Sequence, residues 1–183
     1  MLKNLQTELQ SFGKYVVQQS RSNLTKQKHN VTRDLYSSLG YSITEKDRDF
    51  FLKFTMDEYG TFLDKGVKGA RPSSVLRGKQ KAPNSPYSFK VKRPPMRPLL
   101  DWAKRRNIRL RDSKGRFSKG SYRTIAFILQ RRIFAQGIKP SLFFTKPFIA
   151  AFKKYPNLIR DAYGKDLIEE IKENFNKLQN EQN

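Results

Sequence analysis

Apolar residues near the N-terminus recur at every third or fourth position. The set from Leu2 to Val16 shares one face of a helix. The polar stretch 20–30 has no such stripe, so we expect the first helix to fray there. A second, shorter helix is predicted over residues 35–39, with Gly40 as the residue that ends it.

The period then changes to two, which is typical of a half-buried strand. Apolar side chains alternate over residues 50–56, and residues 41–44 are a candidate partner strand. With residues 45–49 as the turn, the two strands predict a β-hairpin. A short helix is expected over residues 57–65, because acidic residues lie in its first turn and Gly66 stands just past its end.

Periodicity is lost over residues 67–95, which carry five prolines among many Lys and Arg residues. A loop of this length is unusual in a compact domain. Because it holds few apolar residues, we expect it to become ordered only within an assembly. The chain then predicts a helix over 97–106, a hairpin over 107–117 and a helix over 122–136.

The helix over 122–136 has clear signals at both ends. Ser121 is a favourable cap at its start, and Gly137 ends it. We expect its buried face to be formed by four apolar residues, Ile125, Ile128, Leu129 and Ile133.

The C-terminal part of the chain predicts further helices. Pro147 should open one helix, and Pro156 and Gly164 should interrupt it before a last amphipathic helix. That last helix carries its apolar stripe at Leu167, Ile168, Ile171, Phe175 and Leu178. The polar tail 179–183 is expected to be mobile. For Phe143, Phe144 and Phe148, core packing is the expected role, and a contact between subunits is the alternative.

These elements predict an α+β fold. A small antiparallel sheet is packed by the N-terminal and C-terminal helices, and a long basic insertion carries a helix and a hairpin. We divide the chain into residues 1–66, with the first helices and hairpin of the core, residues 67–139, the basic insertion, and residues 140–183, the helices that complete the core.

Charge is concentrated in the middle of the chain. The protein has 38 Lys and Arg against 16 Asp and Glu, a formal charge of +22. From Lys65 to Lys139 there are 22 basic residues and only two acidic ones, Asp101 and Asp112. Like charges cannot be buried together, so this segment must face a polyanion, an acidic partner or water.

Three uses of the basic segment remain open: a solvated loop, an arm that docks on an acidic neighbour, and direct contact with DNA phosphates. No motif for sequence-specific base recognition is present. The densest run is Lys104-Arg105-Arg106. The candidate contact residues are Arg71, Arg77, Lys79, Lys81, Lys90, Lys92, Arg93, Lys104, Arg105, Arg106, Arg109, Arg111 and Arg116.

Known catalytic arrangements find no support in the sequence. There is no cysteine, and His29, the single histidine, stands in a polar stretch where we expect a solvated surface residue. The glycines have no phosphate-loop spacing. We therefore predict no enzyme, catalytic residue, metal or cofactor. No apolar run is long enough to span a membrane.

Two short motifs carry a family resemblance. Tyr59, Asp64 and Gly66 follow directly on the predicted strand, and Pro147-Phe148 opens a late helix. The chain thus resembles the tail-completion, or head–tail joining, proteins of tailed bacteriophages, in which a similar strand runs into a Tyr-Ala-x-x-Val-Glu-x-Gly-Thr motif. Gly60 and Val67 depart from that pattern. About seventy residues also separate the two motifs, which the family usually keeps close together.

The resemblance implies a structural virion protein, made in the cytoplasm of the host bacterium. Such a subunit forms a ring of on the order of six or twelve copies. It binds neighbouring portal, connector or tail proteins around the DNA channel and has no membrane partner. The alternative is a non-sequence-specific nucleic-acid-binding protein that uses residues 67–139. A nuclease with unrecognised carboxylates is a distant third.

Overall fold

The computed structural model describes residues 2–29, 32–46, 49–71 and 80–181. It has the α+β composition expected from the sequence, with seven helices and two two-stranded antiparallel sheets in the described part of the chain. The chain forms two compact units. Unit 1 contains residues 1–27, 34–56 and 143–183, and unit 2 contains residues 28–33 and 57–142.

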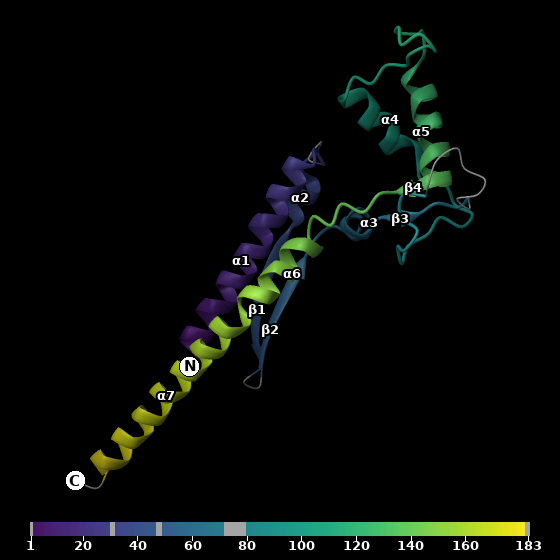
Figure 1. The fold of residues 1–183 in the computed structure, drawn as a ribbon. Coiled ribbons are helices and arrows are strands. Elements are labelled where there is room, and N and C mark those ends of the chain that lie inside the picture. The colour runs from purple at the N-terminus through teal and green to yellow at the C-terminus, as the bar shows by residue number, and fades with distance from the viewer. Residues whose placement is uncertain (1, 30–31, 47–48, 72–79, 182–183) are drawn as a thin grey trace. The chain divides into compact units, whose positions relative to one another are not determined.

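Unit 1 combines helices from both ends of the chain with one β-hairpin (Figure 1). Helix α1 packs against α6, α7 and the hairpin. The hairpin is antiparallel, with Tyr41 opposite Phe54 and Ile43 opposite Leu52, as its alternating pattern predicts. The bounds of the elements are α1 (Lys3–Lys26), α2 (Asp34–Ser38), β1 (Gly40–Lys46), β2 (Asp49–Thr55), α6 (Thr145–Lys154) and α7 (Pro156–Glu181).

Aromatic rings form the core of unit 1. The Phe12 ring lies 5.4 Å from that of Tyr155 and 6.0 Å from that of Phe148, both edge to face. Phe54, from the inner face of β2, contacts Phe148 at 6.0 Å. Such tilted pairs add to the free energy gained by burial alone. The expected core role of Phe148 is therefore confirmed, and Phe143 is fully buried as well.

Several sequence-based boundaries in unit 1 are wrong. The predicted turn 45–49 is shorter than expected, because Glu45 pairs with Phe50 and Lys46 with Asp49. Helix α1 does not fray at residue 20 but continues to Lys26, because Ser20 and Leu24 are fully buried. Gly40 does not cap α2 in a left-handed conformation; it is the first residue of β1. Gly164 does not interrupt the last helix, since α7 runs without a break to Glu181 and so includes part of the predicted tail.

Unit 2 is built around two packed helices. Ala103 of α4 and Ala126 of α5 are fully buried, and the two helices lie against each other (Figure 1). The Ser121 hydroxyl accepts a hydrogen bond from the Thr124 amide at 3.2 Å, so the predicted cap of α5 is confirmed. The bounds are α3 (Tyr59–Lys65), β3 (Val67–Lys68), α4 (Met96–Arg105), α5 (Tyr122–Gln136) and β4 (Gly137–Ile138).

A two-residue ladder closes the long segment between β3 and β4. Val67 pairs with Ile138, and Lys68 pairs with Gly137. Gly137 has a φ of 84°, and a Cβ atom placed there would lie 2.1 Å from the Val67 carbonyl oxygen. Only glycine fits this position without strain. Residues 69 and 136 therefore lie close together although most of unit 2 separates them in sequence.

The described parts of segment 67–95 are hydrogen bonded within the chain itself. The Lys68 amide donates to the Tyr87 carbonyl at 2.8 Å, and the Lys68 carbonyl accepts from Phe89 at 2.9 Å. The Gln80 side chain bonds both backbone groups of Gly69. The prediction that this stretch needs an assembly to order is thus contradicted for residues 67–71 and 80–95. Residues 72–79 lie outside the described part.

The predicted hairpin over 107–117 is reduced to a turn. Arg111 and Phe117 form a single antiparallel bridge, and Gly115 has a φ of 78°. Residues 111–120 are all exposed. Strands gain most of their stability from packing one face, and this segment has no buried face to extend the pairing.

Candidate anion-binding pocket

The two units differ sharply in charge. Unit 2 has 24 Lys and Arg against five Asp and Glu, a balance of +19. Unit 1 has 14 against 11, which leaves +3. Unit 2 thus holds +19 of the protein's net charge of +22. Unit 2 is therefore the place to search for an anion-binding site.

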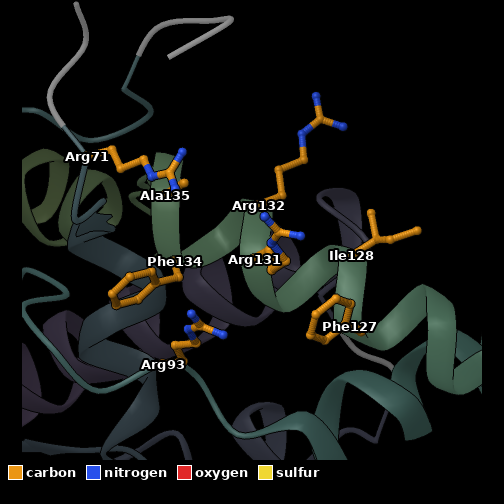
Figure 2. A pocket seen from close by; sticks show the side chains of 8 residues that line it. All are labelled: Arg71, Arg93, Phe127, Ile128, Arg131, Arg132, Phe134 and Ala135. Carbon is orange, nitrogen blue, oxygen red and sulfur yellow. The ribbon is translucent and has the colours of Figure 1, made fainter. Parts of the chain in front are cut away.

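Unit 2 contains an open pocket of about 390 Å³ whose lining includes four arginines (Figure 2). Arg131 and Arg132 belong to α5, whereas Arg71 and Arg93 come from the segments before α4. We call these residues and their apolar neighbours the arginine pocket. The neighbours are Phe127, Ile128, Phe134 and Ala135.

Helical spacing places the α5 residues of the pocket. Phe127, Arg131 and Phe134 stand four and three positions apart, so they share one face of the helix. Phe127 is 43% exposed, and Ile128 is 47% exposed. The expectation that Ile128 belongs to a buried face is therefore wrong, because the segments that pack on α5 leave this side open.

Hydrogen bonds to α5 hold the segments that carry the other two arginines. The Ala70 amide donates to the Phe134 carbonyl at 2.8 Å, and the Arg71 amide donates to the Ala135 carbonyl at 3.3 Å. These bonds also satisfy carbonyls that would be free at the end of the helix. Next to Arg93, the Pro94 carbonyl accepts a bond from the Gln130 side chain at 2.7 Å. Both segments are thus bonded to α5 through their main-chain groups, one by the helix backbone and the other by the Gln130 side chain.

Two of the arginines lie over aromatic rings. The Arg93 guanidinium is 5.8 Å from the centre of the Phe134 ring, and that of Arg131 is 5.7 Å from the Phe127 ring. A ring face attracts the cation and limits its freedom while leaving its N–H groups available. Arg132 differs, since its Nε donates to the Gln136 side chain at 3.3 Å.

The positive charge of the arginine pocket is not balanced by any residue of its own lining. Its eight lining residues include no Asp or Glu. Among the described residues, none of its four arginines forms an ion pair. Four guanidinium groups around one cavity repel each other, and a bound anion would relieve that repulsion. Their planar N–H pairs match the oxygen atoms of a phosphate or a carboxylate.

The pocket is suited to binding and not to catalysis. Its side chains are arginine, phenylalanine, isoleucine and alanine, which supply neither a nucleophile nor a general base near neutral pH. Within the described ranges, no three His, Cys, Asp or Glu side chains are grouped as a metal site. The same ranges contain no helix that is long and apolar enough to cross a membrane.

The structure brings two of the thirteen predicted contact residues into the pocket, Arg71 and Arg93. Lys81, Lys90 and Lys92 are exposed on neighbouring parts of the same segment. The predicted contacts Arg77 and Lys79 lie outside the described residues. The sequence pattern missed Arg131 and Arg132. The sequence feature that could have identified them is a pair of basic residues in an otherwise apolar stretch of a helix, with Phe127 before the pair and Phe134 after it.

The basic run at the end of α4 is exposed and does not line the pocket. Lys104, Arg105 and Arg106 lie at the helix C-terminus, where positive charge is favourable. The Arg106 guanidinium also donates to the Lys28 carbonyl. Next to it, His29 lies at the surface as expected. Partial burial and then the charge of Arg106 lower its pKa.

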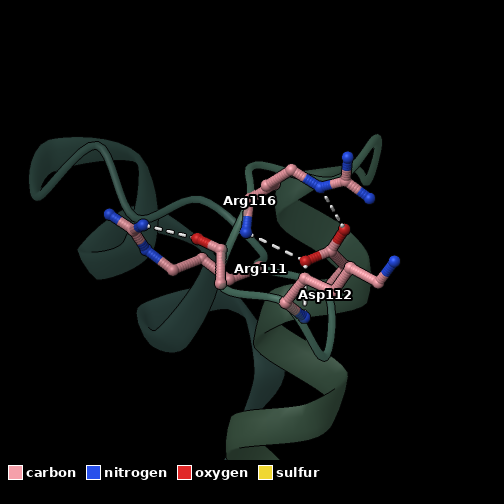
Figure 3. A network of polar contacts seen from close by, with 5 residues as sticks. Arg111, Asp112 and Arg116 are labelled. Carbon is pink, nitrogen blue, oxygen red and sulfur yellow. Dashed lines mark hydrogen bonds and ion pairs between the residues drawn. The ribbon is translucent and has the colours of Figure 1, made fainter.

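Three predicted contact residues are used within the turn 109–117 (Figure 3). The Arg111 side chain donates to the Gly115 carbonyl at 2.7 Å and lies 4.3 Å from the centre of the Phe117 ring. Arg116 forms an ion pair with Asp112 at 3.3 Å. Arg109 is 5.7 Å from the Phe117 ring. These side chains already have partners, which makes them weaker candidates for anion binding.

The motif residues of the resemblance are divided between the two units. In unit 2, Tyr59 is 47% exposed at the start of α3, Asp64 is buried, and Gly66 ends the helix with a φ of 72°. In unit 1, Pro147 is buried in the first turn of α6, and Phe148 packs in the core. Helix α6 begins two residues before Pro147, earlier than predicted.

No protein-family model matches the chain, and neither the curated proteins nor the solved structures include one that is significantly similar to it. The resemblance to tail-completion proteins thus depends on the motif residues alone.

Proposed function

We propose that the protein is a structural subunit of a phage head–tail connector, a ring that joins the portal or capsid to the tail around the DNA channel. One observation carries this proposal. The Leu142 amide donates to the Asp64 carbonyl at 3.0 Å, and the Ser141 amide donates to the Leu63 carbonyl at 3.0 Å. The end of the first motif and the residues leading to the second are therefore adjacent.

This contact supports treating the basic segment as an insertion. The ladder of β3 and β4 brings the two ends of residues 69–136 together. Removing these residues would leave the two motifs close in sequence, as they usually are in the family. An insertion that begins and ends at one place can be added to a small domain without disturbing it. Unit 1, together with α3 and Gly66, which carry the first motif, would then correspond to the family's domain.

In a connector, the arginine pocket would receive oxygen atoms from a carboxylate of a neighbouring ring protein or from the packaged DNA. Both ligands suit four arginines that have no acidic partner in the described structure. The proposal places the protein in the virion, with its own copies and the portal, connector or tail proteins as partners. Such a subunit requires no catalysis and no cofactor.

The arginine pocket favours a second candidate function, non-sequence-specific nucleic-acid binding by the protein alone. Its guanidinium groups and the exposed Phe127 ring could contact phosphates and bases of any sequence. The two candidates differ in salt dependence. Binding that depends mainly on phosphate contacts weakens steeply as salt rises, whereas assembly through apolar surfaces does not.

The experiment is to measure the mass of the purified protein in solution from about 0.05 to 0.5 M salt, with and without duplex DNA. The connector proposal predicts a ring-sized species, or a smaller one that ignores DNA at the higher salt. A small species that binds DNA tightly and loses it steeply with salt would contradict it and support the second candidate.

A further inference from the structure

Unit 1 has an open apolar groove of about 360 Å³. It lies between α1, β2, α6 and the start of α7, and all eight residues that line it are apolar. They include Leu52 and Phe54 from the hairpin, Phe148 and Phe152 from α6, and Ile159 from α7. Phe152 is 64% exposed. An open space with this lining is suited to apolar side chains from another surface.

The same chain carries an exposed apolar stripe farther along α7. Leu167 is 38% exposed, Ile168 54%, Ile171 66% and Phe175 61%. At about 100° per residue, these four side chains share one face of the helix. We call them the α7 stripe. Four large apolar side chains on one face of a helix are typical of a surface that another element covers.

The contacts of Asp166 show why α1 does not cover this stripe. Its carboxylate accepts hydrogen bonds from the Asn4 and Leu5 amides at 3.0 and 2.8 Å, so α7 meets α1 in the first turn of α1. The residues after Asp166 continue past the start of α1, as Figure 1 shows. On the helix, the stripe faces away from the side that carries Asp166.

The stripe cannot reach the groove of its own chain. Ile159 lines the groove, and Phe175 follows sixteen residues later on the same unbroken helix. At 1.5 Å per residue, the two positions lie about 24 Å apart along the helix axis. A straight helix cannot fold back on itself, so the α7 stripe can enter such a groove only in another molecule.

We infer that the α7 stripe of one copy docks in the apolar groove of a second copy. One chain supplies both an apolar projection and an apolar cavity, and this single contact covers both. Pairing two stripes with each other would leave both grooves open. A projection that fits a different surface on its neighbour makes a head-to-tail contact, which propagates into a closed ring or an open chain.

As a description of the ring contact, this inference rests on the proposed connector function. The contact itself is measured on the purified protein alone, so the two can fail separately. A protein that is monomeric alone but assembles with neck proteins would overturn the inference and leave the function standing. A protein that self-associates through stripe and groove but binds no neck protein would support the inference and contradict the proposed function.

The first test uses two variants of the full chain, Ile171→Asp/Phe175→Asp in the stripe and Phe152→Asp in the groove. All three side chains are exposed, so the fold should tolerate the changes. We expect each variant to weaken self-association at least about thirtyfold by sedimentation equilibrium, as at a central interface contact. The control Phe117→Asp changes a 63% exposed aromatic of unit 2 and should associate normally.

Mixing the two defective variants gives the decisive result. The stripe variant keeps an intact groove, and the groove variant keeps an intact stripe, so together they can form one contact and no more. We expect a one-to-one dimer from the mixture and monomers from each variant alone. A groove variant with the mass of the unmodified protein, or a mixture that stays monomeric, would overturn the inference. Far-ultraviolet circular dichroism confirms that each variant is folded.

Cross-linking provides a second measurement that does not depend on charged substitutions. The chain has no cysteine, so Phe175→Cys and Phe152→Cys can each be made as the only thiol in a chain. A short bis-maleimide should join the two variants in a mixture much faster than it joins either variant to itself. Equal rates in all three samples would contradict stripe-to-groove docking.

Discussion

Unit 1 and unit 2 expose different kinds of binding surface. Unit 1 is nearly balanced in charge and presents an apolar groove and an apolar stripe, whereas unit 2 carries most of the positive charge and an arginine pocket. Salt affects the two surfaces differently, since it screens charges and does not weaken apolar contacts. We therefore propose that assembly depends on unit 1 and anion binding on unit 2.

The largest expected difference in stability is between two glycine substitutions, one in each unit. Gly137→Ala should destabilise unit 2 by about 3 kcal/mol or more, because it combines a left-handed backbone with overlap against the Val67 carbonyl. Gly164→Ala should stabilise unit 1 by about 0.5–1 kcal/mol, because Gly164 lies within α7 and a Cβ there meets nothing within 4 Å.

The readouts for this pair can be separated. Trp102 is the single tryptophan of the chain and belongs to unit 2, so its fluorescence reports unfolding there. Circular dichroism at 222 nm reports the helices of both units. In denaturant titrations, Gly137→Ala should lower the free energy of unfolding and Gly164→Ala should raise it. A stable Gly137→Ala protein would contradict the account of how β3 and β4 close the segment between them.

A smaller effect is expected from the carboxylate that joins α7 to α1. Burial acts to raise the pKa of Asp166, but hydrogen bonds from the Leu5 and Asn4 amides and the Asn4 side chain outweigh it, and the pKa lies below its usual value. Asp166→Ala should therefore cost about 1–3 kcal/mol at neutral pH. The control on the same helix is Asp161→Ala, whose exposed pair with Arg160 contributes well under about 1 kcal/mol.

The pH dependence of Asp166 has a definite sign. A carboxyl group whose pKa is lowered by folding stabilises the protein above its unfolded pKa of about 3.9. That contribution is lost as the pH falls through the folded value. The difference in unfolding free energy between the wild-type protein and Asp166→Ala should thus be constant near neutrality and shrink on acidification. A difference that grows in acid would contradict this.

Local signals in the sequence predicted several elements well. Helix α5 begins and ends where Ser121 and Gly137 indicate, because a cap and a left-handed glycine act on adjacent residues. The hairpin of unit 1 followed from its alternating pattern. Errors arose where distant contacts decide the outcome. Buried Ser20 extends α1, and α7 tolerates Gly164 because a glycine in a helix costs only about 1 kcal/mol.

The arginine pocket was only half predictable for the same reason. Arg71 and Arg93 were candidates because they belong to the basic segment, but their juxtaposition with Arg131 and Arg132 depends on hydrogen bonds between parts far apart in sequence. Composition identified residues 65–139 as strongly basic and left open whether they face a polyanion, an acidic partner or water. It did not distinguish arginines with free N–H groups from those, like Arg111 and Arg116, that are bonded within a turn.

The most direct test of the pocket compares two double variants that remove equal charge from unit 2. Arg131→Ala/Arg132→Ala empties half of the pocket, and Arg111→Ala/Arg116→Ala removes arginines already bonded within the turn. Binding of a fluorescent DNA duplex is measured from about 0.05 M salt upward, and the slope of log K against log salt counts phosphate contacts at about 0.9 each.

The pocket variant should bind more weakly, and its slope should be smaller by about 1.8, the value for two lost contacts. The turn variant should change both quantities much less. Equal losses in the two variants would mean that net charge alone governs binding, and they would contradict the assignment of the anion site to the arginine pocket.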